Sequence, residues 1–235
     1  MSPELTGVTL AVPGRRLDEL TDFYVDLLGL QGAREPRGLR LSIGASELRF
    51  EAAPAPPDPF YHFALLVPGN RFEPAHEWLR ARTNLLSRPG DGESVFDFDF
   101  WDAQACYAHD PAGNIVELIA HHGLAESAAH GPFAAGQLRG VSEVGLVTDD
   151  LVSALERLRG AGLELWSGEV AGPRDGFGFA GWKGRTLILC PTGHPWLPTL
   201  RPAESHALTV AIRTGEHANV VARVSEDSSV DVAGS

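Results

Sequence analysis

A carboxylate in the middle of an apolar strand is the first feature of this chain that indicates chemistry. The run from Asp110 to Leu118 reads as a turn, Asp-Pro-Ala-Gly-Asn, followed by a strand that carries Glu117 among aliphatic residues. Asp-Pro and Gly-Asn supply the fixed φ, the left-handed position and the side-chain hydrogen bonds of a hairpin. Burying an ionised glutamate is costly unless it is paired, hydrogen-bonded or bound to a cation. Glu117 therefore predicts a partner, either a cation or an arginine.

The elements that must position Glu117 follow a repeated order of one strand, one helix and two or three strands. Three helices are expected, from Leu17 to Leu28, from Glu73 to Arg82 and from Leu151 to Arg159. Each helix follows a short apolar strand, and the predicted opening strands are Gly7 to Val12, Tyr61 to Val67 and Val141 to Val147.

A fourth copy of the repeat is expected to be truncated. Only one further strand is predicted, Ala207 to Arg213, and the residues after Ser225 are expected to form a frayed end or a weak edge strand. The proline-rich run at residues 54–59 marks a boundary between the first two repeats. We expect one domain at residues 1–122, a linker at 123–138 and a second domain at 139–235.

These repeats resemble the vicinal oxygen chelate superfamily, which includes glyoxalase I, bleomycin-resistance proteins and extradiol dioxygenases. The most specific motifs are Phe23 to Leu30 in the first helix and Asp110 to Leu118 in the second repeat. The stretch Phe100 to Ala103 is similar to an uncharacterised bacterial two-domain branch. The resemblance covers most of the chain up to Arg213 and implies an α+β fold. Tandem βαβββ modules would pair into cupped mixed β-sheets with the helices outside and the fourth module truncated.

The resemblance also implies a metal-ligand position on the first strand and another on the last strand of each module. In the second module these positions fall on His62 and Glu117, and in the third they fall on Glu143 and Ile188. In the first module the first position falls on Gly7. Pairing of the second and third modules would thus bring His62, Glu117 and Glu143 to one cup, with Glu117 and Glu143 also as catalytic residues.

The chemistry of these three side chains supports a metal site. An imidazole and two carboxylates leave two or three positions open around a divalent ion, enough for water and a substrate with two adjacent oxygens. Glu143 lies in an apolar strand, so its burial also needs an explanation. Simpler interpretations remain open, because His62 alone would suit a hydrogen-bonded core position and Glu143 alone would suit the edge of a sheet.

Other residues are weaker candidates for a substrate pocket. Tyr107 and His109 share one face of the strand before Glu117, and Trp101 and Trp182 are aromatic residues that could line the cup. Phe100 and Trp196 are considered with them, although aromatic residues at such positions often belong to the core. His121 and His122 follow the Glu117 strand and are expected to be exposed.

Composition limits the partners of the chain. With 235 residues and 43% hydrophobic content, a substantial core is expected. The formal charge of -12 argues against nucleic acid and anionic membranes as partners. There is no apolar run long enough for a membrane span and no signal-peptide pattern at the N-terminus, so we expect a soluble cytoplasmic protein. A monomer or a homodimer would both be consistent with fused modules.

Two functions follow as hypotheses. The first is a metal-dependent lyase or isomerase related to glyoxalase, acting on a small molecule with vicinal oxygens through a divalent ion such as Mn, Ni, Co, Zn, Fe or Mg. A dioxygenase fits less well, because non-haem iron oxygenases favour two imidazoles and one carboxylate. The alternative is a bleomycin-resistance type protein that binds or sequesters a small molecule without catalysis, as the loss of ligands at Gly7 and Ile188 would allow.

Overall fold

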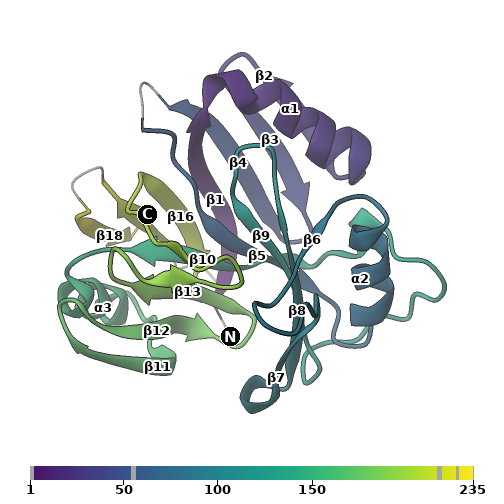
Figure 1. The fold of residues 1–235 in the computed structure, drawn as a ribbon. Helices are drawn as coiled ribbons and strands as arrows, with labels where there is room; N and C mark the ends of the chain where they lie inside the picture. The colour runs from purple at the N-terminus through teal and green to yellow at the C-terminus, as the bar shows by residue number, and fades with distance from the viewer. Residues whose placement is uncertain (1–2, 54–56, 216–218, 226–227, 235) are drawn as a thin grey trace.

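Two large mixed β-sheets build the protein, as Figure 1 shows. The computed structural model describes residues 3–53, 57–215, 219–225 and 228–234. The predicted linker at 54–59 lies partly outside these ranges, at residues 54–56. No helix of the described ranges is long and apolar enough to cross a membrane.

The first sheet joins the first repeat to the last part of the chain. Its strand order is β18-β17-β16-β1-β4-β3-β2, and β1 pairs in parallel with β4 and antiparallel with β16. The prediction of one strand in the fourth repeat was wrong, because β17 and β18 follow β16, with apolar residues alternating along β17. The strands are β1 (Glu4–Pro13), β2 (Gln31–Glu35), β3 (Gly38–Ile43), β4 (Ser46–Ala53), β16 (Leu208–Arg213), β17 (Asn219–Val224) and β18 (Val230–Gly234).

The second sheet joins the second and third repeats, in the order β11-β12-β13-β10-β5-β9-β8-β6, with β7 paired to β8. The two opening strands, β5 and β10, lie antiparallel at its centre. Each sheet thus takes strands from both sides of residues 123–138, and the division into two domains there stays a prediction. The strands are β5 (His62–Val67), β6 (Leu85–Leu86), β7 (Phe96–Phe98), β8 (Ala103–His109), β9 (Ile115–His121), β10 (Gly140–Val147), β11 (Leu165–Gly172), β12 (Asp175–Trp182) and β13 (Arg185–Cys190).

The three predicted helices are present. The first is α1 (Leu17–Thr21) continued by a π-helical segment η2 (Asp22–Leu27), and the others are α2 (Phe72–Arg80) and α3 (Leu151–Gly160). α3 begins after Asp150, whose carboxylate accepts a hydrogen bond from the Ser153 backbone nitrogen, as expected of an N-cap. Leu27, the last residue of the π-helical segment, is 44% exposed, whereas Phe23 and Tyr24 of the same segment are buried.

Side chains on the two faces of the second sheet enter two different clusters. On β5, Phe63 and Leu65 join the main core with residues of the first sheet and the helices. The alternate residue, Ala64, faces a smaller cluster rich in aromatic side chains on the other side of the sheet. The α+β class and the cupped sheets of tandem modules are therefore confirmed.

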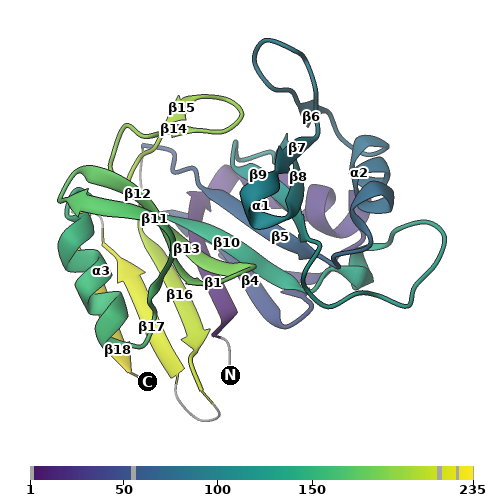
Figure 2. The same cartoon turned by 90° about the horizontal axis from the view of Figure 1, so that it is seen from below.

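Two short segments stand over the aromatic cluster. One is the 3-10 turn η3 (Asp99–Trp101) after β7, and the other is a small hairpin of β14 (Pro195–Trp196) and β15 (Arg201–Pro202). Figure 2 shows the hairpin and the β6–β7 segment rising on the same side of the molecule. The residues between them are thereby shielded from water.

Candidate active-site cavity

Neighbouring strands of the second sheet carry a row of polar side chains on one face. Ala64 of β5 is flanked by Glu117 on β9 and by Glu143 on β10. The row continues outward to Tyr107 on β8 and to Thr186 on β13. Because side chains alternate along a strand, all five point to the same face. Two strand spacings, about 9–10 Å, separate the backbones of the two glutamates.

The strand register also relates the second and third modules by an approximate twofold symmetry axis. Glu117 pairs with Ala64, and Ile188 pairs in the same way with Gly145. The residue two positions before Ala64 is His62, and the residue two positions before Gly145 is Glu143. This agrees with the alignment made from the sequence, in which His62 corresponds to Glu143 and Glu117 corresponds to Ile188.

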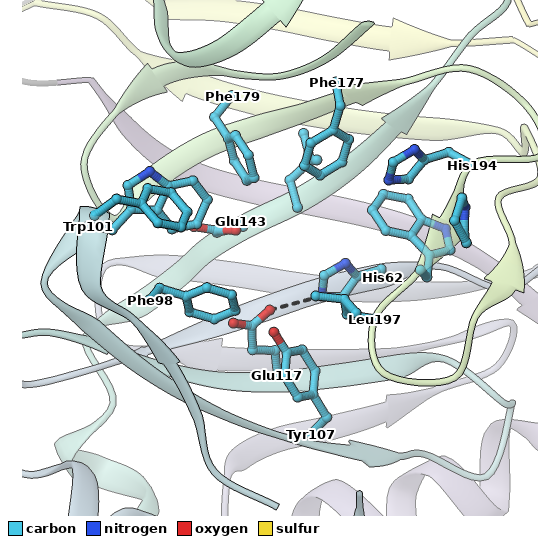
Figure 3. Close-up of a pocket in the computed structure, with 14 residues that line it drawn as sticks. His62, Phe98, Trp101, Tyr107, Glu117, Glu143, Phe177, Phe179, His194 and Leu197 are labelled. Atoms are coloured by element: carbon cyan, nitrogen blue, oxygen red, sulfur yellow. Dashed lines mark hydrogen bonds and ion pairs between the residues drawn. The ribbon is translucent and has the colours of Figure 1, made fainter. Parts of the chain in front are cut away.

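These residues form the floor of a cavity of about 300 Å³ with mainly aromatic and aliphatic walls, shown in Figure 3. Such a volume lies at the lower end of the range of small-molecule sites, about 300–1,000 Å³. The full lining consists of His62, Phe98, Phe100, Trp101, Tyr107, Glu117, Glu143, Phe177, Phe179, Ile188, His194, Pro195, Trp196 and Leu197.

His62 and Glu117 form a buried hydrogen-bonded pair, with 2.9 Å between His62 Nε2 and Glu117 Oε2. Both side chains are less than one-tenth exposed, and His62 Nδ1 has no hydrogen-bond partner among the described residues. Glu117 thus has the partner that its position in an apolar strand predicted, and that partner is an imidazole. Such a carboxylate orients the ring and fixes which ring nitrogen carries the hydrogen.

Glu143 lies apart from this pair in the same cavity, as Figure 3 shows. Its side chain is 3% exposed, and its Oε1 atom has no hydrogen-bond partner in the described chain. Burial, and then the charge of Glu117, raise the pKa of Glu143 well above its ordinary value. A neutral carboxylic acid at this position can donate a hydrogen bond into the cavity.

Glu143→Gln is expected to change how stability depends on pH. Between the ordinary pKa of about 4.3 and the raised folded value, the folded state keeps a proton that the unfolded chain has lost. The contribution of Glu143 to the free energy of unfolding therefore falls by about 1.4 kcal/mol per pH unit as the pH rises through this window. The variant has no such proton, so it should gain stability relative to wild type as the pH rises above about 5 in urea titrations.

The exposed Glu126→Gln provides the matched control, and its stability difference from wild type should not depend on pH in this way. A parallel pH dependence of wild type and Glu143→Gln would contradict the raised pKa.

His121 belongs to this region, and the expectation that it is exposed was wrong. Its side chain is fully buried, with Nε2 4.0 Å from Glu143 Oε1. Strand β9 extends through His121, one residue further than expected, and Trp101 and Trp166 pack beside its ring. Burial, and then the charge of Lys183, lower the pKa of His121 to about 4.

Two of the four weak pocket candidates line the cavity. Tyr107 and Trp101 are buried in its wall. Burial, and then the charges of Glu117 and Glu143, raise the pKa of Tyr107 well above its ordinary value, so its hydroxyl remains a donor.

The other two candidates were wrong. His109, at the end of β8, is exposed, and its Nδ1 lies 3.3 Å from the backbone oxygen of Asn114. Trp182 is 51% exposed at the turn after β12 and does not line the cavity. In both cases the strand end places the side chain beyond the cup.

Sequence reasoning missed several wall residues, among them Phe98, Phe177, Phe179, His194 and Leu197. Phe177 and Phe179 are two positions apart on β12, so the alternation of side chains along a strand could have predicted that they share one face. His194 stacks on Phe177 with 4.3 Å between ring centroids. His194 and Leu197 come from the loop after β13, for which the sequence contained no positional signal.

The predicted metal ligands are not gathered around one point in this arrangement. Within the described ranges, no group of three or more His, Cys, Asp or Glu side chains is arranged to hold an ion. His62 Nε2 and Glu117 Oε2 are bonded to each other, and the ring nitrogen near Glu143 belongs to His121. The metal assignment of His62, Glu117 and Glu143 stays a prediction.

Comparison with known proteins shows a likeness at the level of the fold. No protein-family model matches the sequence, and no curated protein matches it. A point mutant of glyoxalase I from Zea mays is 15% identical over 99% of this chain and 92% of its own, with a TM-score of 0.53. A second point mutant of the same enzyme, in another crystal form, is 14% identical over 99% and 94%, with a TM-score of 0.52.

A smaller solved structure covers only part of the chain. A glyoxalase/bleomycin resistance protein/dioxygenase from Alicyclobacillus acidocaldarius is 23% identical over 48% of this chain and 89% of its own, with a TM-score of 0.34. The two full-length matches span both sheets. The chain therefore adopts, over nearly its whole length, the fold of glyoxalase I, as its resemblance to the vicinal oxygen chelate superfamily implied.

Proposed function

We propose that this protein is an enzyme of lyase or isomerase type that moves a proton on a small, largely apolar molecule with two adjacent oxygens. One observation carries the proposal: a hydrogen-bonded His62–Glu117 pair and a separate buried acid, Glu143, lie on the floor of one aromatic-walled cavity. A buried acid with a displaced pKa, as Glu143 has, is typical of catalytic sites. A cavity used only for sequestration has no need of such an acid.

His62 is the proposed base. When Nε2 donates its hydrogen to Glu117, the free lone pair of the ring is on Nδ1, which has no partner in the described chain. Nδ1 would take a proton from the substrate carbon next to a carbonyl group. The electron pair of the broken C–H bond forms a carbon–carbon double bond, and the carbonyl oxygen becomes negatively charged. Glu117 would stabilise the imidazolium that results.

Glu143 is the proposed hydrogen-bond donor to that oxygen. Its raised pKa favours the neutral carboxyl group, and a neutral acid stabilises a developing oxyanion without the repulsion that a carboxylate would cause. The surrounding rings exclude water and so strengthen this interaction. The same rings would hold the apolar body of the substrate.

Hydrogen exchange at carbon tests the proposal. α-Hydroxyacetophenone has an aromatic ring, a carbonyl group and an adjacent hydroxyl, and its CH₂ protons exchange in D₂O only through an enediolate. The wild-type protein should accelerate deuterium incorporation, and His62→Gln should reduce this acceleration by a factor of about 10²–10⁴. Mass spectrometry of the compound measures the exchange.

His109→Gln is the matched control, because it removes an exposed imidazole outside the cavity. The variants are compared only if their thermal unfolding shows a folded state. Exchange that is equal in wild type and His62→Gln would overturn the proposed proton transfer. If the compound still quenched tryptophan fluorescence in that case, the binding or sequestering alternative would be favoured.

A metal-dependent lyase or isomerase is the second candidate. Its supporting observation is the register that places His62, Glu117 and Glu143 on one face around Ala64. A divalent ion there would act as a Lewis acid on substrate oxygens. Elemental analysis of protein purified without chelators tests it, with one ion per chain expected in wild type and none in Glu117→Ala. Metal-free protein that still catalyses exchange would exclude this candidate.

A further inference from the structure

The geometry points to Trp196 as the residue that controls access to His62 and the size of ligand that the cavity accepts. This inference deepens the proposed function, because it concerns the same cavity. Trp196 belongs to the hairpin segment, residues 191–203, which leaves β13 and contains β14 and β15. The side chain is only 3% exposed although the segment itself lies on the surface.

Trp196 rests on two residues of the sheet at once. Its ring centroid is 4.9 Å from that of His62, in an edge-on arrangement. It also lies over Gly145, where a Cβ atom would come within 2.8 Å of the indole ring. Only glycine leaves room for the ring at this place. Trp196 therefore covers the end of the cavity floor where the proposed base lies.

The indole is held by packing alone. Within the described ranges its nitrogen makes no hydrogen bond to another residue, whereas Trp101 Nε1, in the wall of the same cavity, donates to Ser167 Oγ at 3.1 Å. A buried indole N–H usually has a partner. Trp196 can thus leave its position without breaking a hydrogen bond, and Trp101 cannot.

Backbone hydrogen bonds join the hairpin segment into one unit. Backbone bonds from Gly193 to Ala203 and from Ala203 to His194 join its two ends, and Leu200 donates to the Trp196 carbonyl oxygen at 2.7 Å. The segment is also held to the rest of the molecule by the stacking of His194 on Phe177 and by Arg201 over the Phe60 ring. Only its tip, where Leu197 and Leu200 are 43% and 53% exposed, has few buried contacts, and such parts of a structure open at low free-energy cost.

Chemical modification of histidine tests the inference without any substrate. Diethylpyrocarbonate modifies accessible unprotonated imidazoles, and peptide mass spectrometry measures the rate at each histidine. In wild type, His62 should react much more slowly than the exposed His130. Trp196→Ala should raise the rate at His62 by about tenfold or more, since the covering ring is gone. Gly145→Val should do the same by displacing the ring.

Two variants serve as matched controls. Trp182→Ala removes an exposed tryptophan outside the cavity, and Gly136→Ala adds a Cβ where no atom lies within 4 Å. Neither should change the rate at His62. Equal rates at His62 in wild type and Trp196→Ala would overturn the inference, as would a wild-type rate at His62 equal to that of His130.

Ligand size provides a second measurement. In the D₂O exchange assay, Trp196→Ala should raise the ratio of the rate with the naphthyl analogue of α-hydroxyacetophenone to the rate with the parent compound by about tenfold. An unchanged ratio would overturn the role in ligand size. If no exchange occurs in any variant but His62 becomes reactive in Trp196→Ala, the control of access stands and the proposed function fails. If exchange occurs but His62 does not become reactive in Trp196→Ala, only the control of access is rejected.

Discussion

Replacing Asp110 by alanine is expected to lower the free energy of unfolding by about 3–5 kcal/mol. The Asp110 carboxylate is buried in the turn between β8 and β9 and accepts four hydrogen bonds. They come from the backbone nitrogens of Ala112 and Asn114, from the Asn114 side chain at 2.7 Å and from the Tyr24 hydroxyl at 2.9 Å. Alanine would leave all four donors without this partner, and the donors of Tyr24 and Asn114 are buried.

The effect should extend beyond the turn, because Tyr24 lies in the first repeat and Asn114 in the second. The Asn114 side-chain oxygen also accepts a hydrogen bond from the Tyr61 backbone nitrogen, just before β5. Asp110 thus joins the first helix to the hairpin that positions Glu117 in the second sheet. Urea unfolding followed by circular dichroism measures the loss.

Two variants make this prediction specific. Tyr24→Phe removes one of the four hydrogen bonds and should cost about 1 kcal/mol. Asp26→Ala changes an exposed aspartate on the same helix and should stay within about 0.5 kcal/mol of wild type. A loss for Asp110→Ala no larger than that of Tyr24→Phe would show that the network does not support the fold as described.

His121→Gln is expected to remove a large acid destabilisation. The folded pKa of about 4 lies below the ordinary value of about 6.5. Between these values the unfolded chain binds a proton that the folded state does not, so the free energy of unfolding rises with pH by about 1.4 kcal/mol per unit. Over the whole window this amounts to about 3 kcal/mol, which urea unfolding at several pH values would detect.

The slopes of His121 and Glu143 have opposite signs where their windows overlap. Wild type should therefore show a weaker dependence of stability on pH where the two windows overlap, and each single variant should reveal the slope of the other residue. His130→Gln, an exposed histidine, is the control and should keep the wild-type profile. Identical profiles of His121→Gln and wild type would reject the lowered pKa.

The central part of the site could be predicted from the sequence because it depends on local patterns. The turn at Asp110 to Asn114 fixes the register of β9, and the apolar runs around His62 and Glu143 identify the two central strands. Strand alternation then places all three side chains on one face. The pairing of the second and third repeats followed from the family resemblance and agrees with the sheet order.

The rest of the cavity depends on contacts between distant parts of the chain. Trp196 reaches His62 from a loop without regular periodicity, and its place over Gly145 follows only from the folded sheet. His121 is buried because η3 covers it, which no property of its own strand indicates. The separation of Glu143 from the His62–Glu117 pair depends on side-chain conformations that spacing does not determine.

The pairing of β1 with β16 also has a consequence for how the protein is made. Glu4 lies opposite Arg213 in this pair, so β1 leaves the ribosome long before β16, which is its second neighbour in the sheet. Contacts so distant in sequence slow folding. Until then β1 presents an unpaired edge that can pair with other chains. Nascent copies of this protein should therefore depend on chaperones during synthesis, and truncation before β16 should cause aggregation.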